Sequence, residues 1–190
     1  MESIKITATN RDGVGKEAAR KVRNNGQIPA VLYGHGVEGS VPLSVEPKSL
    51  GKALSSDKGL NGLFTLEREG GANEQVLVRE LQRHPVSRKI LHIDLVAPNL
   101  EEAQLFAIPV NFSGRSIGVQ TGGRLRTPYR SVRVLSLPMN VPAQIEIDIT
   151  SMDHGDAVMA SDLDLPEGVT PIYDRDYVVV KVVAPRGKQS

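Results

Sequence analysis

The chain of 190 residues carries 23 Lys and Arg against 22 Asp and Glu, a net charge of +1, and contains no cysteine. The lack of cysteine excludes disulfides, thiolate zinc sites and cysteine nucleophiles, and no apolar run is long enough to span a bilayer. Aromatic residues make up only 4%, so Val, Ile and Leu must form the core, which favours β structure in a cytosolic protein.

The first half of the sequence predicts a small β-barrel, or a strongly bent sheet, with two helices. Short alternating or apolar segments predict strands at residues 4–8, 28–33, 41–46, 62–69, 74–82 and 89–96. A short basic helix is expected after the polar loop 10–15, ending at Asn24-Asn25-Gly26, a sequence that terminates helices. A second helix is expected from Pro47, which suits a first helical turn, to Leu54.

The second half of the sequence predicts an all-β domain. A polar segment with a proline, residues 97–102, indicates a boundary between domains at 1–96 and 97–190. Strands are expected at residues 105–112, 132–137, 144–149 and 177–183. The glycine-containing segment 118–128 is expected to be a mobile or partner-dependent loop. The whole chain is therefore expected to be mainly β, with a few short helices.

A dense group of cations lies between residues 11 and 23. Its members are Arg11, Lys16, Arg20, Lys21 and Arg23. On helical geometry Lys16, Arg20 and Arg23 share a stripe about 60° wide, and like charges four residues apart cost about 0.2–0.5 kcal/mol per pair. Such a stripe is typical of a surface that binds a polyanion such as nucleic acid. The alternative is a solvated helix in which Glu17 and Lys21 balance part of the charge as an i,i+4 pair.

Strand 89–96 carries a histidine and an aspartate on one face. Its apolar residues alternate toward the core, so His92 and Asp94 point together to the other side. One interpretation is a base and its orienting acid in a hydrolase, although no serine stands in a nucleophile elbow. Another is a surface that reads RNA base edges or sugar hydroxyls, with Tyr33 or the imidazole stacking on a base. The third is a solvated polar face.

Charge is segregated in the second half. Residues 103–145 contain no acidic residue, whereas residues 146–176 contain nine acidic residues against one arginine. The basic stretch consists of Arg115, Arg124, Arg126, Arg130 and Arg133. It predicts either a second nucleic-acid contact or a docking face for an acidic protein, because solvation alone favours mixed signs. The acidic residues do not match a calcium loop, and neither a metal nor another cofactor is expected.

Three motifs of the first half resemble those of ribosomal protein twenty-five of the bacterial large subunit, a family that binds 5S rRNA. They are the run from Arg11 to Gly34, Gln82-Arg-His-Pro85 and His92-Ile-Asp-Leu95. Turn positions of the second half, such as Gly122-Gly123 and Leu165-Pro-Glu-Gly168, are similar to those of the longer, two-domain general stress form of that family.

The resemblance implies a non-enzymatic constituent of the large ribosomal subunit, in the cytoplasm, whose N-terminal barrel binds an internal loop of 5S rRNA. The RNA-binding residues that it implies are Arg11, Lys16, Arg20, Lys21, Arg23, Tyr33, His92 and Asp94. It further implies 23S rRNA and other ribosomal proteins as partners, without a membrane or a small-molecule substrate. The rival hypothesis is a stress-related protein-binding module that docks through the face from Arg115 to Arg133.

Overall fold

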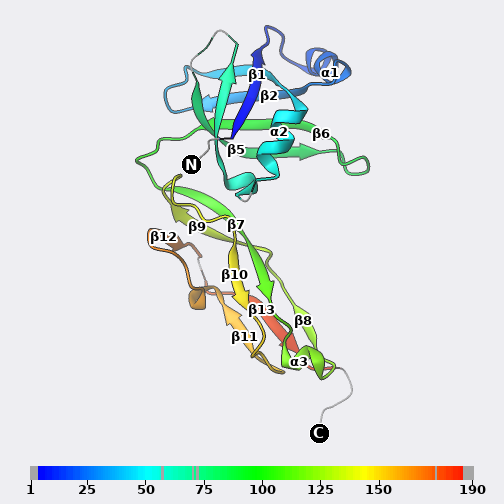
Figure 1. The fold of residues 1–190 in the computed structure, drawn as a ribbon, viewed down its shortest axis with the longest axis vertical. Helices are drawn as coiled ribbons and strands as arrows, with labels where there is room; N and C mark the ends of the chain where they lie inside the picture. The colour runs from blue at the N-terminus through cyan, green and yellow to red at the C-terminus, as the bar shows by residue number, and fades with distance from the viewer. Residues whose placement is uncertain (1–3, 57, 70, 72, 174, 186–190) are drawn as a thin grey trace. The chain divides into compact units, whose positions relative to one another are not determined.

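The computed structural model describes residues 4–56, 58–69, 71, 73–173 and 175–185. It contains two compact units, residues 1–102 and 103–190 (Figure 1). The described strands form a closed barrel in the first unit, and a four-stranded and a three-stranded sheet in the second. The prediction of a mainly β chain with a few short helices is confirmed. In the described part of the chain, no helix combines the length and apolar character that a membrane span requires.

The strands of the first unit close into a barrel in the order β1-β3-β2-β6-β5-β4. They are β1 (Lys5–Asn10), β2 (Ile28–Gly34), β3 (Ser40–Val45), β4 (Leu63–Arg68), β5 (Glu74–Arg83) and β6 (Ile90–Ala97). Neighbouring strands are antiparallel, except that β1 runs parallel to β4 and β2 runs parallel to β6. The predicted barrel and its six strands are therefore confirmed.

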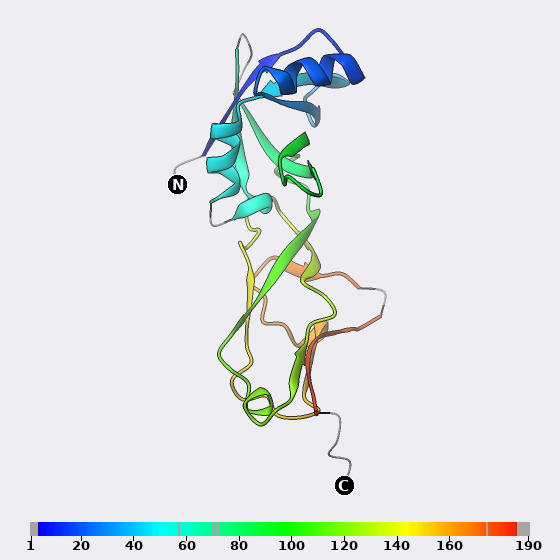
Figure 2. The same ribbon diagram turned by 90° about the vertical axis from the view of Figure 1, so that its right-hand side faces the viewer.

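Alternating apolar residues fill the barrel, and two helices lie at separate places on its outside (Figure 2). Helix α2 (Pro47–Leu54) packs on β1 and buries Leu50 and Ala53 completely, and the 3-10 turn η1 (Gly59–Asn61) follows it. Helix α1 (Lys16–Asn24) contacts β2 but buries none of its residues completely. The difference shows that α2 belongs to the core, whereas α1 is attached to the surface.

The second unit contains two small sheets. The first has the order β10-β7-β9-β12 and consists of β7 (Gln104–Ser113), β9 (Ser131–Ser136), β10 (Ile145–Asp148) and β12 (Val169–Pro171). The second has the order β11-β13-β8 and consists of β8 (Arg124–Arg126), β11 (Ala157–Met159) and β13 (Val178–Val183). Valines dominate the buried side chains of β9 and β13, as the low aromatic content requires. Of the nine acidic residues near the C-terminus, Asp174 lies outside the described residues.

The segment 118–128, which was expected to be a loop, is a loop only in part. Helix α3 (Ile117–Gln120) and strand β8 occupy this segment, and the 3-10 turn η2 (Ala160–Asp162) follows β11. The fully buried Ser116 starts α3, because its Oγ accepts from the Val119 amide at 3.3 Å and donates to the Met152 carbonyl at 2.7 Å. Pairing with β13 then makes a strand of β8.

Gly34, at the end of β2, is expected to tolerate no side chain. Its φ is 120°, and a Cβ would collide with the backbone of Ala97, whose carbonyl accepts from the His35 amide at 2.8 Å. Gly34→Ala is therefore expected to lower the free energy of unfolding by more than about 2 kcal/mol, the cost of strain plus a lost contact. Urea denaturation measures this loss.

Gly36→Ala is the matched control. Gly36 also has a positive φ, 75°, but no atom lies within 4 Å of the position that its Cβ would occupy. Only the left-handed backbone penalty of about 1 kcal/mol applies there. Equal losses in the two variants would show that the contact with Ala97 does not constrain Gly34.

Candidate nucleic-acid interface

Helix α1 presents unbalanced positive charge to solvent. Its four cations, Lys16, Arg20, Lys21 and Arg23, are all exposed, while Ala18, Ala19 and Val22 are half-buried. Among the described residues, none of these four cations forms an ion pair with an acidic side chain. The expected Glu17–Lys21 pair is therefore not formed, and the charge of the helix is left for another partner.

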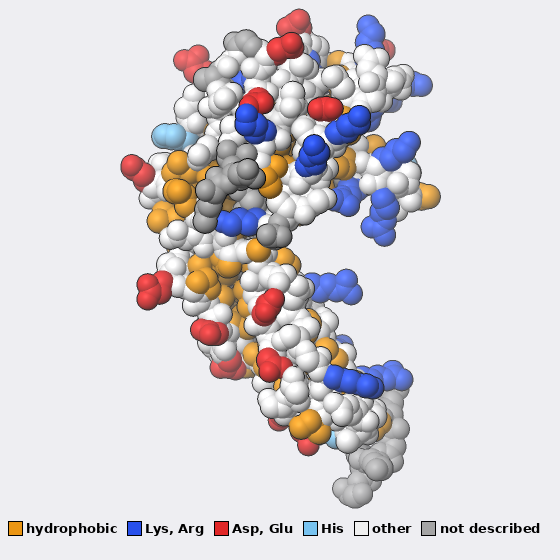
Figure 3. Space-filling view, in the orientation of Figure 1, with side chains coloured by type: hydrophobic (Ala, Val, Ile, Leu, Met, Phe, Trp, Pro, Cys, Tyr) orange, Lys and Arg blue, Asp and Glu red, His pale blue; other side chains and the backbone are white. Residues whose placement is uncertain are grey.

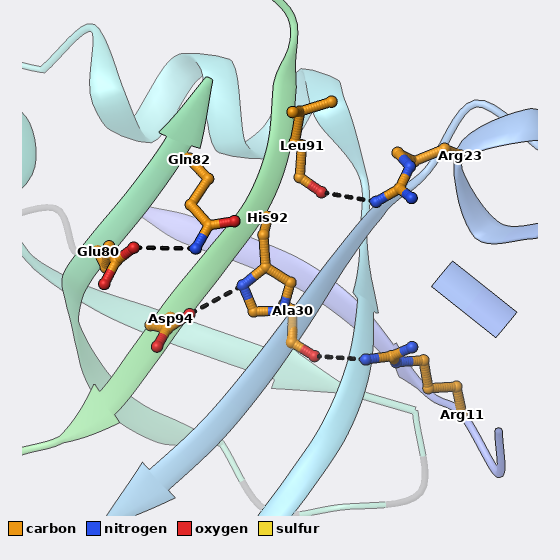
Figure 4. Close-up of polar contacts among 8 residues, drawn as sticks. All are labelled: Arg11, Arg23, Ala30, Glu80, Gln82, Leu91, His92 and Asp94. Carbon is orange, nitrogen blue, oxygen red and sulfur yellow. Dashed lines mark hydrogen bonds and ion pairs between the residues drawn. The ribbon is translucent and has the colours of Figure 1, made fainter. Parts of the chain in front are cut away.

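Two of the predicted RNA-binding arginines also hold the protein together (Figure 4). Arg23, in the last turn of α1, donates from Nη1 to the Leu91 carbonyl of β6 at 3.2 Å. Arg11, in the loop before α1, donates to the Gly13 carbonyl at 3.3 Å and to the Ala30 carbonyl at 3.4 Å. The buried Nε of Arg11 has no hydrogen-bond partner among the described residues. These bonds attach the basic segment to β2 and β6, and they leave other N–H groups of each guanidinium available.

A block of four polar residues covers the outer side of β5 and β6. His92 Nδ1 lies 2.8 Å from Asp94 Oδ1, and both side chains keep about a quarter of their surface exposed (27% and 25%). Gln82 lies opposite His92 and Glu80 opposite Asp94, and Gln82 Nε2 donates to Glu80 Oε1 at 2.9 Å. We refer to these four residues as the polar block. The predicted strand parity is confirmed, because Ile93 in the same strand is fully buried.

Tyr33 lies on the same outer side of the barrel as the polar block. In the parallel pairing of β2 with β6, Val31 is opposite Asp94 and Tyr33 is opposite Val96. The side chains of β2 alternate, so Tyr33 follows Val31 on the outer side, where it is half-buried. The structure therefore brings the basic helix, the polar block and Tyr33 together on β2, β5 and β6.

The His92–Asp94 pair lacks the other parts of a catalytic site within the described residues. No hydroxyl group there is hydrogen-bonded to His92, and no group of three or more His, Cys, Asp or Glu is placed to hold a metal ion. What the polar block offers instead is a row of hydrogen-bond donors and acceptors on an accessible sheet face. Such a row is suited to base edges and ribose hydroxyls.

The hairpin between β5 and β6 adds cations that are not among the predicted RNA-binding residues. Arg83, Arg88 and Lys89 are exposed there, and in Figure 3 Lys and Arg side chains gather over α1 and this hairpin. The loop is closed by bonds from the His84 amide to the Lys89 carbonyl at 2.8 Å and from the Arg88 amide to the His84 carbonyl at 2.9 Å. The signal in the sequence was the presence of Arg83 and Arg88 between two predicted strands, with Lys89 at the start of the second.

The five arginines of the second unit do not all lie on one sheet. Arg124 and Arg126 are exposed on β8, and Arg133 is exposed on β9 in the other sheet. Arg115 and Arg130 lie in the segments between strands and are also exposed. These positions do not test whether the arginines form one docking face from Arg115 to Arg133, so that face stays a prediction.

Comparisons with known proteins cover nearly the whole chain. The model of the Ribosomal L25p family matches residues 6–95, and that of the C-terminal domain of ribosomal protein TL5 matches residues 105–186. The large ribosomal subunit protein bL25 of Sorangium cellulosum is 39% identical over 185 residues, 97% of this chain and 80% of the relative. The chain belongs to the bL25 family. The bL25 proteins of Syntrophotalea carbinolica (39% identical, 96% and 88% covered) and of a Thermoanaerobacter species (36%, 98% and 91%) agree.

Family membership decides between several of the interpretations. Members of the bL25 family are structural proteins of the ribosome and not enzymes, so the hydrolase interpretation of His92 and Asp94 is wrong. The expected ribosomal location in the cytoplasm and the resemblance to the two-domain form of the family are confirmed.

Arg23→Ala is expected to loosen α1 without unfolding the barrel. The helix has no fully buried residue, so the bond to the Leu91 carbonyl is a main attachment. Losing about 1 kcal/mol of hydrogen bonding raises the equilibrium population of the locally opened helix about fivefold. Hydrogen exchange of the α1 amides measures this change. Arg20→Ala, on the same helix but without such a bond, is the control, and equal exchange in both variants would contradict the anchoring role.

Proposed function

We propose that this chain binds 5S rRNA in the large ribosomal subunit through its first unit. The binding surface consists of α1, the polar block and Tyr33. The bond between Arg23 and the Leu91 carbonyl supports this proposal most directly, because it holds a cationic helix against the strand that carries His92 and Asp94. Groups that neutralise phosphates and groups that read bases are thereby joined on one surface.

The cations of α1 supply the part of binding that does not depend on sequence. Lys16, Arg20 and Lys21 are exposed and make no ion pair among the described residues, so a phosphate can approach each of them. Arg11 and Arg23 contact phosphates with the N–H groups that their backbone bonds leave over. Phosphate contacts fix position and register on RNA.

The polar block and Tyr33 supply selectivity. Asp94 fixes the imidazole of His92 by holding Nδ1, so Nε2 is available to a base edge or a 2′-hydroxyl. Gln82 and Glu80 continue the row of donors and acceptors along β5, and the half-exposed ring of Tyr33 offers a stacking surface. A shallow minor groove that displays 2′-hydroxyls fits such an open sheet face.

Titration of the full chain against fluorescently labelled 5S rRNA tests the proposal. Unlabelled 5S rRNA is expected to displace the label at much lower concentration than other structured RNAs of equal length, such as fragments of other ribosomal RNAs. Equal competition by all RNAs would show non-specific binding and contradict the proposal.

Arg20→Ala is expected to weaken binding to 5S rRNA and to reduce the slope of log affinity against log salt by about one phosphate contact, roughly 0.7–0.9. Lys52→Ala removes an exposed cation of α2, away from the proposed surface, and is the matched control. If the affinity and salt slope of Arg20→Ala equal those of the wild type, α1 is not part of the interface.

His92→Ala is expected to weaken binding to 5S rRNA about fivefold, the value of one hydrogen bond of about 1 kcal/mol, with an unchanged salt slope. His154→Ala, a substitution of the same kind in the second unit, controls for general effects. A change of salt slope in His92→Ala would instead place the imidazole against a phosphate and overturn its role in base or sugar recognition.

A further inference from the structure

The three-stranded sheet of the second unit carries like charges in direct opposition. In the antiparallel pairing of β8 with β13, Arg126 lies opposite Lys181, and Arg124 lies opposite Val183 on the same face of the sheet. On the other side of Lys181, β11 contributes Ala157 and no acid. We refer to Arg124, Arg126 and Lys181 as the cation row.

The sheet gains no internal stability from this arrangement. Like charges directly opposite on antiparallel strands destabilise a sheet, and no member of the cation row forms an ion pair with another described residue. Arginines on β8 are explained in part by its position at the edge of the sheet, where charge prevents pairing with other chains. Lys181 lies on the central strand, so protection of an edge does not explain its position. The cation row is therefore suited to an external anion.

A cluster of three tyrosines lies beyond one end of the segment in which β8 and β13 are paired. Tyr129 follows β8 and Tyr177 precedes β13, and since these strands are antiparallel both tyrosines lie at the same end of the pair. Their ring centroids are 4.4 Å apart, and the ring of Tyr173 meets Tyr177 edge-on at 6.3 Å. Burial and the neighbouring Tyr129 raise the pKa of Tyr177, against the opposing charge of Arg133.

The tyrosine cluster leaves aromatic surface uncovered. Tyr129 is 49% exposed and Tyr173 is 36% exposed, although this chain has only four tyrosines and no tryptophan. Tyr177 contacts both rings, so the exposed rings are held in place. Cations beside fixed aromatic rings form the usual site for an unpaired strand of nucleic acid, with phosphates on the cations and bases stacked on the rings.

We propose that the β8–β13 pair of the second unit binds an unpaired RNA strand, with its phosphates on the cation row and a base on Tyr129. In Figure 3 Lys and Arg side chains lie over the β8 side of this unit. RNA is also the ligand in the proposed function of the first unit, and this proposal has nothing else in common with it. The site is separate from α1 and the polar block.

Arg126→Glu separates a binding role from a structural one. Glutamate opposite Lys181 replaces repulsion by attraction, so the melting temperature is expected to stay equal or to rise. The probe is a labelled twelve-nucleotide oligoadenylate, added to the full chain that has been saturated with 5S rRNA. Arg126→Glu is expected to weaken oligoadenylate binding at least tenfold and to reduce the salt slope by about two contacts, because the introduced carboxylate also engages Lys181. The affinity for 5S rRNA is expected to stay unchanged.

Tyr129→Ala and an acidic peptide complete the test. Tyr129→Ala is expected to weaken oligoadenylate binding about tenfold with an unchanged salt slope, since stacking carries no charge.

A twelve-residue polyglutamate is expected to bind more weakly than the RNA, and equal binding would favour an acidic protein as partner and overturn the proposal. Unchanged oligoadenylate binding in Arg126→Glu, or an equal loss of 5S rRNA affinity, would also overturn it. Arg20→Ala is expected to leave oligoadenylate binding intact. A failure of the proposed 5S rRNA binding through α1 is thereby distinguished from a failure of the proposed site on β8 and β13.

Discussion

Closure of the barrel is the constraint on which the first unit depends. Each of the six strands has a neighbour on both sides, so no edge is left unpaired and the inner side must be filled by apolar residues. In β6 this requirement turns Ile93 and Leu95 inward and directs His92 and Asp94 outward. The outward-facing residues of the strand belong to the proposed RNA surface, and they alternate with the inward-facing residues that form the core.

Predictions from the sequence succeeded where the signal was local. Alternating residues located the barrel strands, and Pro47 marked the start of α2 because proline fits a first helical turn. Strands β8, β11 and β12 have three residues each, too few to show alternation, and they exist because longer strands pair with them. The bond from Arg23 to Leu91 joins residues 68 positions apart, so no local pattern contains it.

Uncompensated cations occur on both units, and each group lies where the fold can tolerate it. Helix α1 buries no residue completely, and the cation row lies across a small sheet whose buried side is formed by valines such as Val180 and Val182. In both places the repulsion is confined to the surface, while separate apolar residues hold the unit together. Each of the two proposed RNA surfaces would place phosphates against this charge.

The parallel pairing of β2 with β6 has a consequence for synthesis of the chain. Ala30 pairs with Ile93, so β2 has no partner on that side until β6 has been made. The basic helix and Tyr33 emerge early from the translating ribosome, whereas His92 and Asp94 emerge late. A nascent chain therefore exposes charge before it possesses the assembled surface, and the selective binding that we propose requires release of nearly the whole first unit. Non-local pairing of this kind delays completion of the proposed surface until the first unit has folded.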